Sequence, residues 1–187
     1  MTQKPVVGVM GASANDALTA VEQSRQANLA ERLGASLAAH ECVLLTGATT
    51  GLPDLVARAF RGRGGFALGV SPAENRREHL QRFGLPADGS DVIIYTGFGY
   101  KGRNVINIRS ADIVVIFGGS IGTLNEFTIA YDEGKIIGVL EGTGGVADQV
   151  RELLQALRKK TQGALFFERD AAALLRMCLA ELWRRSG

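Results

Sequence analysis

Cysteine and histidine are scarce in this sequence of 187 residues, which contains two of each. Cys42 and Cys178 have no second cysteine at a C-x-x-C spacing, and we interpret both as small buried hydrophobic residues. No combination of His, Asp and Glu has the spacing of a metal site. The sequence therefore predicts neither a metal centre nor a redox pair of cysteines.

Long apolar runs are also missing. No run approaches the about 20 residues that a membrane-spanning helix needs, and the first residues lack the apolar core of a signal peptide. The net charge is only +2, and the arginine clusters have no interleaved aromatic residues. We therefore expect a cytoplasmic protein with no membrane and no nucleic-acid partner.

Several well-known catalytic motifs are absent. There is no G-x-x-x-x-G-K-[ST], which excludes a P-loop nucleotide hydrolase, and no G-x-S-x-G of a serine hydrolase. The first glycine turn does not supply G-x-G-x-x-G. The second predicted strand ends in Thr46-Gly47 and not in the acidic residue that would hold an NAD ribose. A nicotinamide-dependent dehydrogenase is therefore disfavoured.

What the sequence does contain is a regular alternation of two patterns. Short β-branched runs predict strands at Val6–Met10, Cys42–Thr46, Phe66–Val70, Val92–Tyr95, Asp112–Phe117, Ile136–Leu140 and Ala164–Phe167. Apolar repeats at helical spacing predict helices at Ala27–Ala39, Leu52–Arg63, Val105–Ser110, Leu124–Glu133, Val146–Lys159 and Ala171–Arg185.

Most of the strand runs are continuously apolar, which is typical of strands buried on both faces of a parallel sheet. The alternation predicts one α/β domain over residues 1–187, with a Rossmann-like, doubly wound, mainly parallel sheet of about seven strands and helices on both faces. Residues 71–90 are the least regular part, and a mobile flap is one interpretation of them.

Turns rich in glycine, serine or threonine follow four of the first five predicted strands. Because the carboxyl ends of parallel strands meet at one edge of a sheet, we expect these turns to converge. The candidate phosphate- or ligand-binding residues in them are Gly11, Ala12, Ser13, Thr46, Gly47, Gly118, Gly119, Ser120, Gly122 and Thr123. Glycine lets backbone N–H groups approach an anion, and the helix after Gly118–Thr123 would point its positive end at it. The alternative is that this segment is only a tight strand–helix turn.

Two ionisable residues accompany these turns. Glu126 lies three positions after Thr123, and thus on the same face of the predicted helix. Arg103 follows the turn 97–102, from which a guanidinium could reach a phosphate or a sugar. The alternatives are a carboxylate that only complements the helix dipole and a solvated arginine. Asp54 is a remote candidate for a second carboxylate in the site.

The stretch from Arg103 to Glu126 resembles the signature of the LOG family, an arginine followed by a strand and P-G-G-x-G-T-x-x-E. Gly119, Gly122, Thr123 and Glu126 match that motif, whereas Gly118 replaces its proline and Ser120 its second glycine. The related molybdenum cofactor carrier proteins have an opening K-P-x-x-G-V-M-G similar to Lys4–Gly11, and an L-L-T-G loop similar to Leu44–Gly47.

The resemblance to the LOG family implies a phosphoribohydrolase that releases a free base from a nucleoside 5′-monophosphate, with Arg103 and Glu126 as catalytic residues. The resemblance to the carriers implies a binding protein for a phosphorylated ligand such as molybdenum cofactor. Both imply a homodimer, for which the apolar face of Leu124–Tyr131 is a candidate, and burial within one chain explains that face equally well. Members of this group are often labelled lysine decarboxylases, but only Lys101 among the five lysines lies near the predicted site.

Overall fold

The computed structural model describes residues 3–14 and 19–187. The strands are β1 (Val6–Gly11), β2 (Val43–Thr46), β3 (Phe66–Ser71), β4 (Val92–Tyr95), β5 (Ile113–Phe117), β6 (Ile136–Leu140) and β7 (Ala164–Glu168). The helices are α1 (Ala20–Ala38), α2 (Leu52–Arg61), α3 (Arg76–Gln81), α4 (Gly99–Ser110), α5 (Ile121–Asp132), α6 (Gly145–Ala156) and α7 (Ala171–Ser186).

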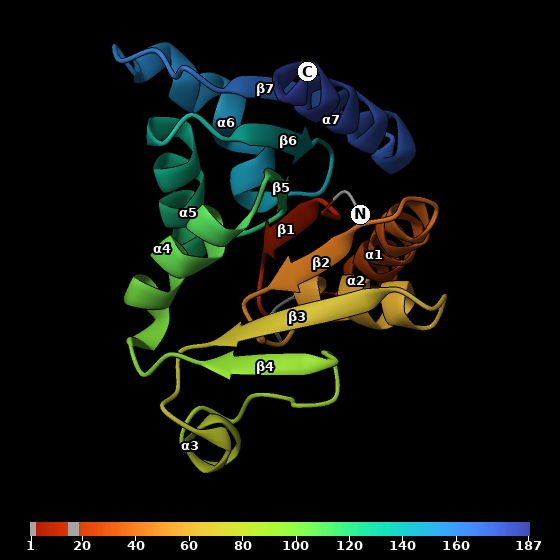
Figure 1. Cartoon of the computed structure of the whole chain (residues 1–187), viewed down its shortest axis with the longest axis vertical. Coiled ribbons are helices and arrows are strands. Elements are labelled where there is room, and N and C mark those ends of the chain that lie inside the picture. The colour runs from red at the N-terminus through yellow and green to blue at the C-terminus, as the bar shows by residue number, and fades with distance from the viewer. Residues whose placement is uncertain (1–2, 15–18) are drawn as a thin grey trace.

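The seven strands form one parallel sheet in the order β4-β3-β2-β1-β5-β6-β7 (Figure 1). The chain runs outward from β1 to one edge, returns to β5 beside β1, and then runs to the other edge. This order confirms the predicted Rossmann-like, doubly wound fold. It also places the reversal of strand order between β1 and β5, where such folds bind their ligands.

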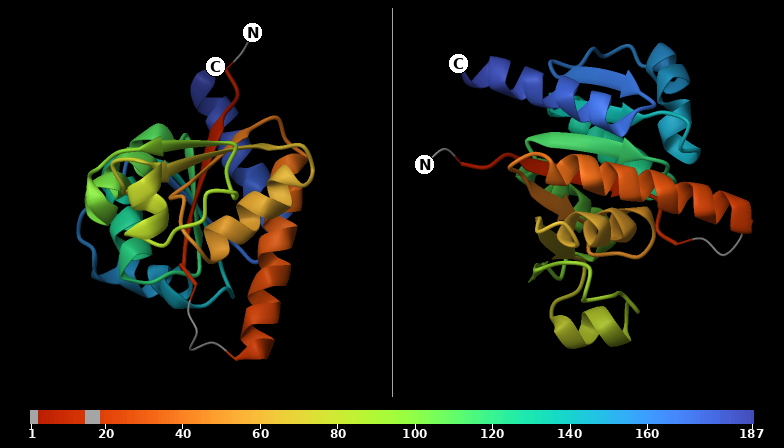
Figure 2. Two further views of the ribbon diagram at one scale, coloured as in Figure 1. Left: turned by 90° about the horizontal axis from the view of Figure 1, so that it is seen from below. Right: turned by 90° about the vertical axis from the view of Figure 1, so that its right-hand side faces the viewer.

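Helices cover both faces of the sheet, as predicted (Figures 1 and 2). One apolar core contains Leu33 of α1, Phe60 of α2 and Leu174 of α7. The other contains Ile108 of α4, Phe127 of α5 and Val150 of α6. Strands β5 and β6 lie between these cores, which explains why they are apolar at every position and buried throughout.

Two helices, α1 and α4, begin about two turns earlier than the apolar periodicity predicts. α1 begins at Ala20, where Thr19 and Glu22 form a reciprocal capping box in front of a polar first turn. α4 begins at Gly99, so residues 99–102 are helical and Arg103 does not follow a flexible turn. In both cases the missing signal is a mainly polar helix start, which has no apolar stripe.

Residues 71–90, expected to be irregular, contain helix α3, which extends beyond the β4 edge of the sheet (Figures 1 and 2). Asn75 caps this helix by accepting a hydrogen bond from the Glu78 amide, 3.0 Å away. His79 is fully buried and fixes the segment to β3. Because this segment is rich in charged residues, its sequence did not predict α3, which the buried His79 side chain attaches to β3.

Both cysteines are buried, as the sequence predicts. Cys42 and Cys178 are buried in the first core, and burial raises the pKa of their thiols to about 11 and about 12. Phe127 and Ala130 are fully buried, so this part of the apolar face of α5 packs in the second core of the same chain. Within residues 3–14 and 19–187, no helix combines the length and the apolarity that crossing a membrane requires.

Candidate functional site

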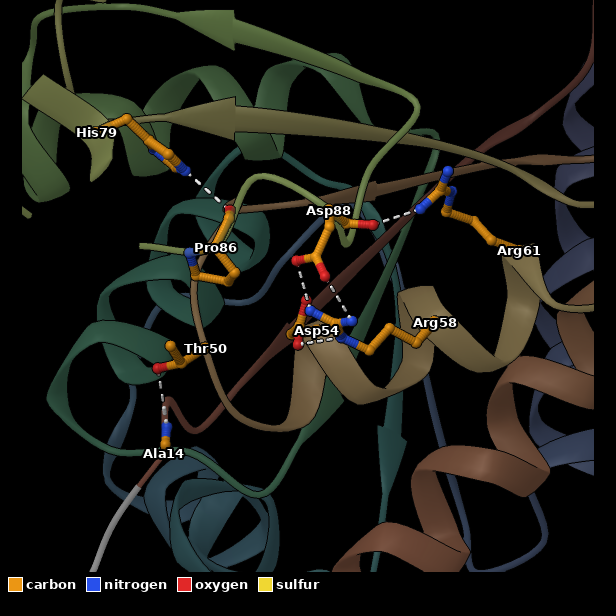
Figure 3. A network of polar contacts seen from close by, with 8 residues as sticks. All are labelled: Ala14, Thr50, Asp54, Arg58, Arg61, His79, Pro86 and Asp88. Atoms are coloured by element: carbon orange, nitrogen blue, oxygen red, sulfur yellow. Dashed lines mark hydrogen bonds and ion pairs between the residues drawn. The ribbon is translucent and has the colours of Figure 1, made fainter. Parts of the chain in front are cut away.

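The turns after β1, β2 and β5 meet beside the reversal of strand order. Gly11 and Phe117 are register partners at the ends of β1 and β5, so the turns that follow them lie next to each other. The loop after β2 is joined to the first turn by the Leu52 amide, which donates to the Ala12 carbonyl at 2.8 Å. The Ala14 amide also donates to Oγ1 of Thr50, 3.3 Å away (Figure 3). Three of the four turns predicted to converge therefore do so, whereas the segment after β4 continues into helix α4.

A pocket of about 500 Å³ opens at this convergence. Eight of the predicted site residues line it: Gly11, Ser13, Gly47, Arg103, Ser120, Gly122, Thr123 and Glu126. These residues come from the turns after β1, β2 and β5 and from helices α4 and α5. The volume is typical of a site for a small organic ligand.

Four other predicted residues lie outside this pocket. Ala12 and Gly119 line a neighbouring hollow of about 340 Å³, which shares Ser13 and Ser120 with the main pocket. Thr46 is buried, and its Oγ1 accepts a hydrogen bond from the Ala48 amide. These three residues therefore do not line the main pocket, although Ala12 and Gly119 lie directly beside it.

The backbone of Gly118, predicted to contact a ligand, instead bonds to other parts of the chain. Its amide donates to Oγ1 of Thr143 at 2.9 Å, and its carbonyl accepts from the Ala147 amide at 3.0 Å. The Gly119 carbonyl likewise accepts from the Val146 amide. These two glycines therefore join the turn after β5 to the start of α6, and the Gly118 amide is not available to an anion.

The start of α5 has first-turn amides without intrahelical acceptors, as the sequence predicts. Its N-cap residue Ser120 makes no side-chain cap, and the first intrahelical bond that returns to it comes from the Leu124 amide. The amides of Gly122 and Thr123 thus belong to the first turn, whose N–H groups have no intrahelical acceptors. A Cβ at Gly122 would meet no atom within 4 Å, so this position is open to the pocket.

The floor of the pocket is a buried ion pair. Arg103 and Glu126 are only 5% and 6% exposed, and Nη1 of the arginine lies 3.4 Å from Oε1 of the carboxylate. Burial raises the pKa of Glu126 to about 7, against the opposing effects of Arg103, Asn107 and Lys101. Burial also lowers the pKa of Arg103, and its Nε has no hydrogen-bond partner among the described residues.

Further lining residues come from the segment after α3 and from α4, and of these the sequence places only Lys101 near the site. Phe83, Gly84 and Leu85 reach it from the segment after α3, and Tyr100 and Lys101 reach it from the first turn of α4. Asn104 also lines the pocket, where its amide donates to Oδ1 of Asn125 and its own Oδ1 accepts from Arg103. A helical reading of residues 99–110 could have found Tyr100 and Asn104, because they share a face with Arg103.

Asp54 is not a second carboxylate of this site. It does not line the pocket, and its Oδ2 accepts from Nε of Arg58 at 2.7 Å on α2 (Figure 3). Glu126 is therefore the one carboxylate among the described residues that line the pocket. Arg109 of α4 does not line the pocket, and its Nε lies 2.9 Å from Oε1 of Glu133, the residue that follows α5.

Comparisons with known proteins agree with this architecture. The model of the SLOG cluster4 family matches residues 4–175. An uncharacterized protein from Archaeoglobus fulgidus is 31% identical over 135 residues, which are 72% of this chain and 79% of that protein.

Solved structures extend the comparison over nearly the whole fold. The X-ray structure of TM1055 matches with a TM-score of 0.81 and 26% identity, covering 94% of this chain and 99% of the other. The molybdenum cofactor carrier protein of Chlamydomonas reinhardtii matches with a TM-score of 0.71 and 28% identity, covering 95% and 99%.

Proposed function

This chain belongs to the SLOG cluster4 family, and from that premise we propose that it binds a small phosphorylated ligand and holds it as a carrier, molybdenum cofactor being the candidate cargo. The resemblance to a carrier protein over 95% of the chain supports this choice. In this proposal the phosphate lies at the start of α5 and the rest of the ligand occupies the pocket.

The observation on which the proposal depends is the donor set on one side of the pocket. The amides of Gly122 and Thr123 begin a helix with no side-chain cap, and the helix dipole adds partial positive charge there. Arg103 and Lys101 line the same pocket and supply two formal positive charges. Glu126, with a pKa of about 7, is protonated in a large fraction of molecules at neutral pH and so opposes an anion less than an ordinary carboxylate would.

The ionisable side chains of the pocket favour binding of a ligand over catalytic cleavage of it. Cleavage of a glycosidic bond generally uses two carboxylates that flank the bond. The described part of the pocket supplies Glu126, whereas Asp54 is paired with Arg58 elsewhere. A pocket with one buried carboxyl and several donors is better suited to holding a phosphorylated ligand than to hydrolysing it.

The carrier proposal is tested on protein purified from its own cells under native conditions. Metal analysis and mass spectrometry should find molybdenum and a pterin in amounts that approach one per chain. A Thr123→Val variant keeps the shape of the side chain but lacks its hydroxyl donor, and it should retain much less. Native protein free of molybdenum and pterin would contradict the carrier assignment.

Phosphate recognition is tested separately. Calorimetric titration with inorganic phosphate and with AMP should give binding that Thr123→Val weakens. Thr128→Ala, an exposed position on the same helix, is the matched control. Binding that Thr123→Val leaves unchanged would exclude the Thr123 hydroxyl as a donor, and a wild type that binds neither ligand would contradict phosphate recognition in this pocket.

One observation favours a second candidate function, phosphoribohydrolase activity. A carboxyl whose pKa is about 7 can act as a general acid or base near neutral pH, and Glu126 lies beside Arg103 in the pocket. Incubation with nucleoside 5′-monophosphates would then release free base, detected by chromatography. Release no faster than that of a Glu126→Ala variant would rule this activity out.

A further inference from the structure

Two aromatic side chains also line the pocket, beside the charged donors. Phe83 and Tyr100 both line the pocket, and their rings meet edge to face with centroids 5.4 Å apart. We propose that these two side chains, the aromatic wall, bind the planar heterocycle of the ligand. This inference rests on the proposed function, because it assumes that the phosphate occupies the start of α5.

The exposure of the two rings supports a binding role. Tyr100 is 45% exposed, and Phe83 is half-buried, although core positions are available to aromatic residues elsewhere in the fold. Aromatic side chains that line a pocket offer a flat apolar surface, and every heterocyclic base has a π-face that can stack on it. Two partly exposed rings in the same pocket therefore indicate a flat apolar group as their partner.

The charges beside the wall fit the same ligand class. The guanidinium of Arg103 lies 5.8 Å from the centre of the Tyr100 ring, so the arginine is shared between the aromatic wall and the buried carboxyl of Glu126. Lys101 follows Tyr100 directly and also lines the pocket. A ligand with a ring at one end and a phosphate at the other would satisfy both sides of the site.

Phe83 is held in place before any ligand binds. Its amide donates to the Glu78 carbonyl, and the Leu85 amide donates to the His79 carbonyl, which closes the turn after α3. The His79 ring lies 2.8 Å from Oγ of Ser71 and 2.9 Å from the Pro86 carbonyl oxygen. The segment that carries Phe83 is therefore fixed to the end of β3.

A second anchor follows a few residues later. Both carboxylate oxygens of Asp88 accept from Arg58, at 3.0 and 2.7 Å, and the Asp88 carbonyl accepts from Arg61 (Figure 3). Residues 83–85 thus lie between two attachment points, one on β3 and one on α2. Because the aromatic wall is already ordered, it loses less conformational entropy when a ring binds against it.

The experiment compares ligands with and without a ring. Calorimetric titrations use AMP, dihydroneopterin monophosphate and ribose 5-phosphate on the wild type and on Phe83→Leu and Tyr100→Leu. The matched control is Phe98→Leu, which removes an exposed ring that does not line the pocket. Circular dichroism and the melting temperature establish that each variant is folded.

We expect at least one ring-bearing ligand to bind the wild type about tenfold more tightly than ribose 5-phosphate, as stacking on one aromatic side chain would give. Phe83→Leu should remove most of that advantage and leave ribose 5-phosphate binding within about twofold of the wild type, since the phosphate donors are untouched. Phe98→Leu should behave as the wild type.

Two results would overturn the inference while leaving phosphate recognition intact. In the first, neither ring-bearing ligand binds better than ribose 5-phosphate. In the second, Phe83→Leu and Phe98→Leu behave alike. If the wild type binds none of the three ligands, the phosphate site itself fails, and the aromatic-wall assignment is overturned with it.

Discussion

Gly47 lies against the guanidinium of Arg103 so closely that a Cβ atom at residue 47 would be 2.3 Å from Nη1. The glycine-rich turn after β2 therefore also affects the site through the position of Arg103. Its glycine was expected to present an amide to a phosphate, and the structure shows a second use, which is to leave room for a buried arginine. The contact joins the end of β2 to α4, two elements that are far apart in the sequence.

This contact predicts the effect of Gly47→Ala. The added methyl group must displace the Arg103 guanidinium, which would then leave the pocket floor. A hydrogen bond to a charged group contributes roughly 1.5–3 kcal/mol, so binding of AMP or inorganic phosphate should weaken by about tenfold or more. Calorimetric titration measures the change. Gly62→Ala, at the end of α2 and away from the pocket, is the control, and equal affinities in both variants would contradict the prediction.

Gly122→Ala should separate binding from stability. No atom lies within 4 Å of the position that its Cβ would occupy, and its backbone is helical, so the folded chain accepts alanine. Alanine is favoured over glycine in a helix by up to about 1 kcal/mol, and the melting temperature should stay the same or rise. The methyl group enters the pocket, however, and phosphate affinity should fall. A variant that binds as tightly as the wild type would show that the ligand does not approach this turn.

Glu126→Gln should change how stability depends on pH. The folded protein keeps the Glu126 proton up to about pH 7, whereas an unfolded chain releases it above about 4.5. The folded state therefore binds more protons between these values, and the free energy of unfolding of the wild type falls as the pH rises through them.

Glutamine does not titrate, so the stability of Glu126→Gln relative to the wild type should rise between pH 5 and pH 8, by roughly 1–3 kcal/mol. Urea unfolding at a series of pH values measures this difference. Glu152→Gln, on the exposed side of α6, controls for the loss of one carboxylate. A constant difference between Glu126→Gln and the wild type over this range would show that Glu126 is not protonated in the folded state.

His79 and Asp88 both anchor the segment that carries Phe83, but their burial differs. His79 is fully buried and its ring bonds to Ser71 and Pro86, so His79→Leu leaves buried polar groups without partners and should cost about 2–4 kcal/mol of stability. The Asp88 side chain is 72% exposed, and Asp88→Asn should have a much smaller effect, because water screens the ion pair with Arg58. Urea unfolding compares the two variants, and similar losses would contradict this ranking.

Much of the site could be predicted because it follows from local patterns. Continuously apolar runs indicate strands buried on both faces, and the carboxyl ends of such strands share one edge. Gly11 ends β1, Gly47 and Gly122 follow β2 and β5, and all three glycines line the pocket. Glu126 was predicted from its position one helical turn after Thr123, which places both on the same side of α5.

The contributions of Gly118 and Phe83 could not be predicted in the same way. The amide of Gly118 is taken by Thr143, which lies 25 residues later in the sequence. Phe83 reaches the pocket because His79 and Asp88 attach its segment to β3 and to α2. Nothing in the local sequence around either residue specifies these partners.

Local sequence patterns were enough to predict the parallel sheet, the edge at which its turns meet, and the positive helix start that follows β5, because each depends on residues close together in the chain. The three-dimensional fold was needed to establish which turn amides are available, how deeply Arg103 and Glu126 are buried, and which side chains lie beside them. Burial and hydrogen-bond partners depend on segments that meet only when the chain folds, and the pKa of Glu126 is set by that burial.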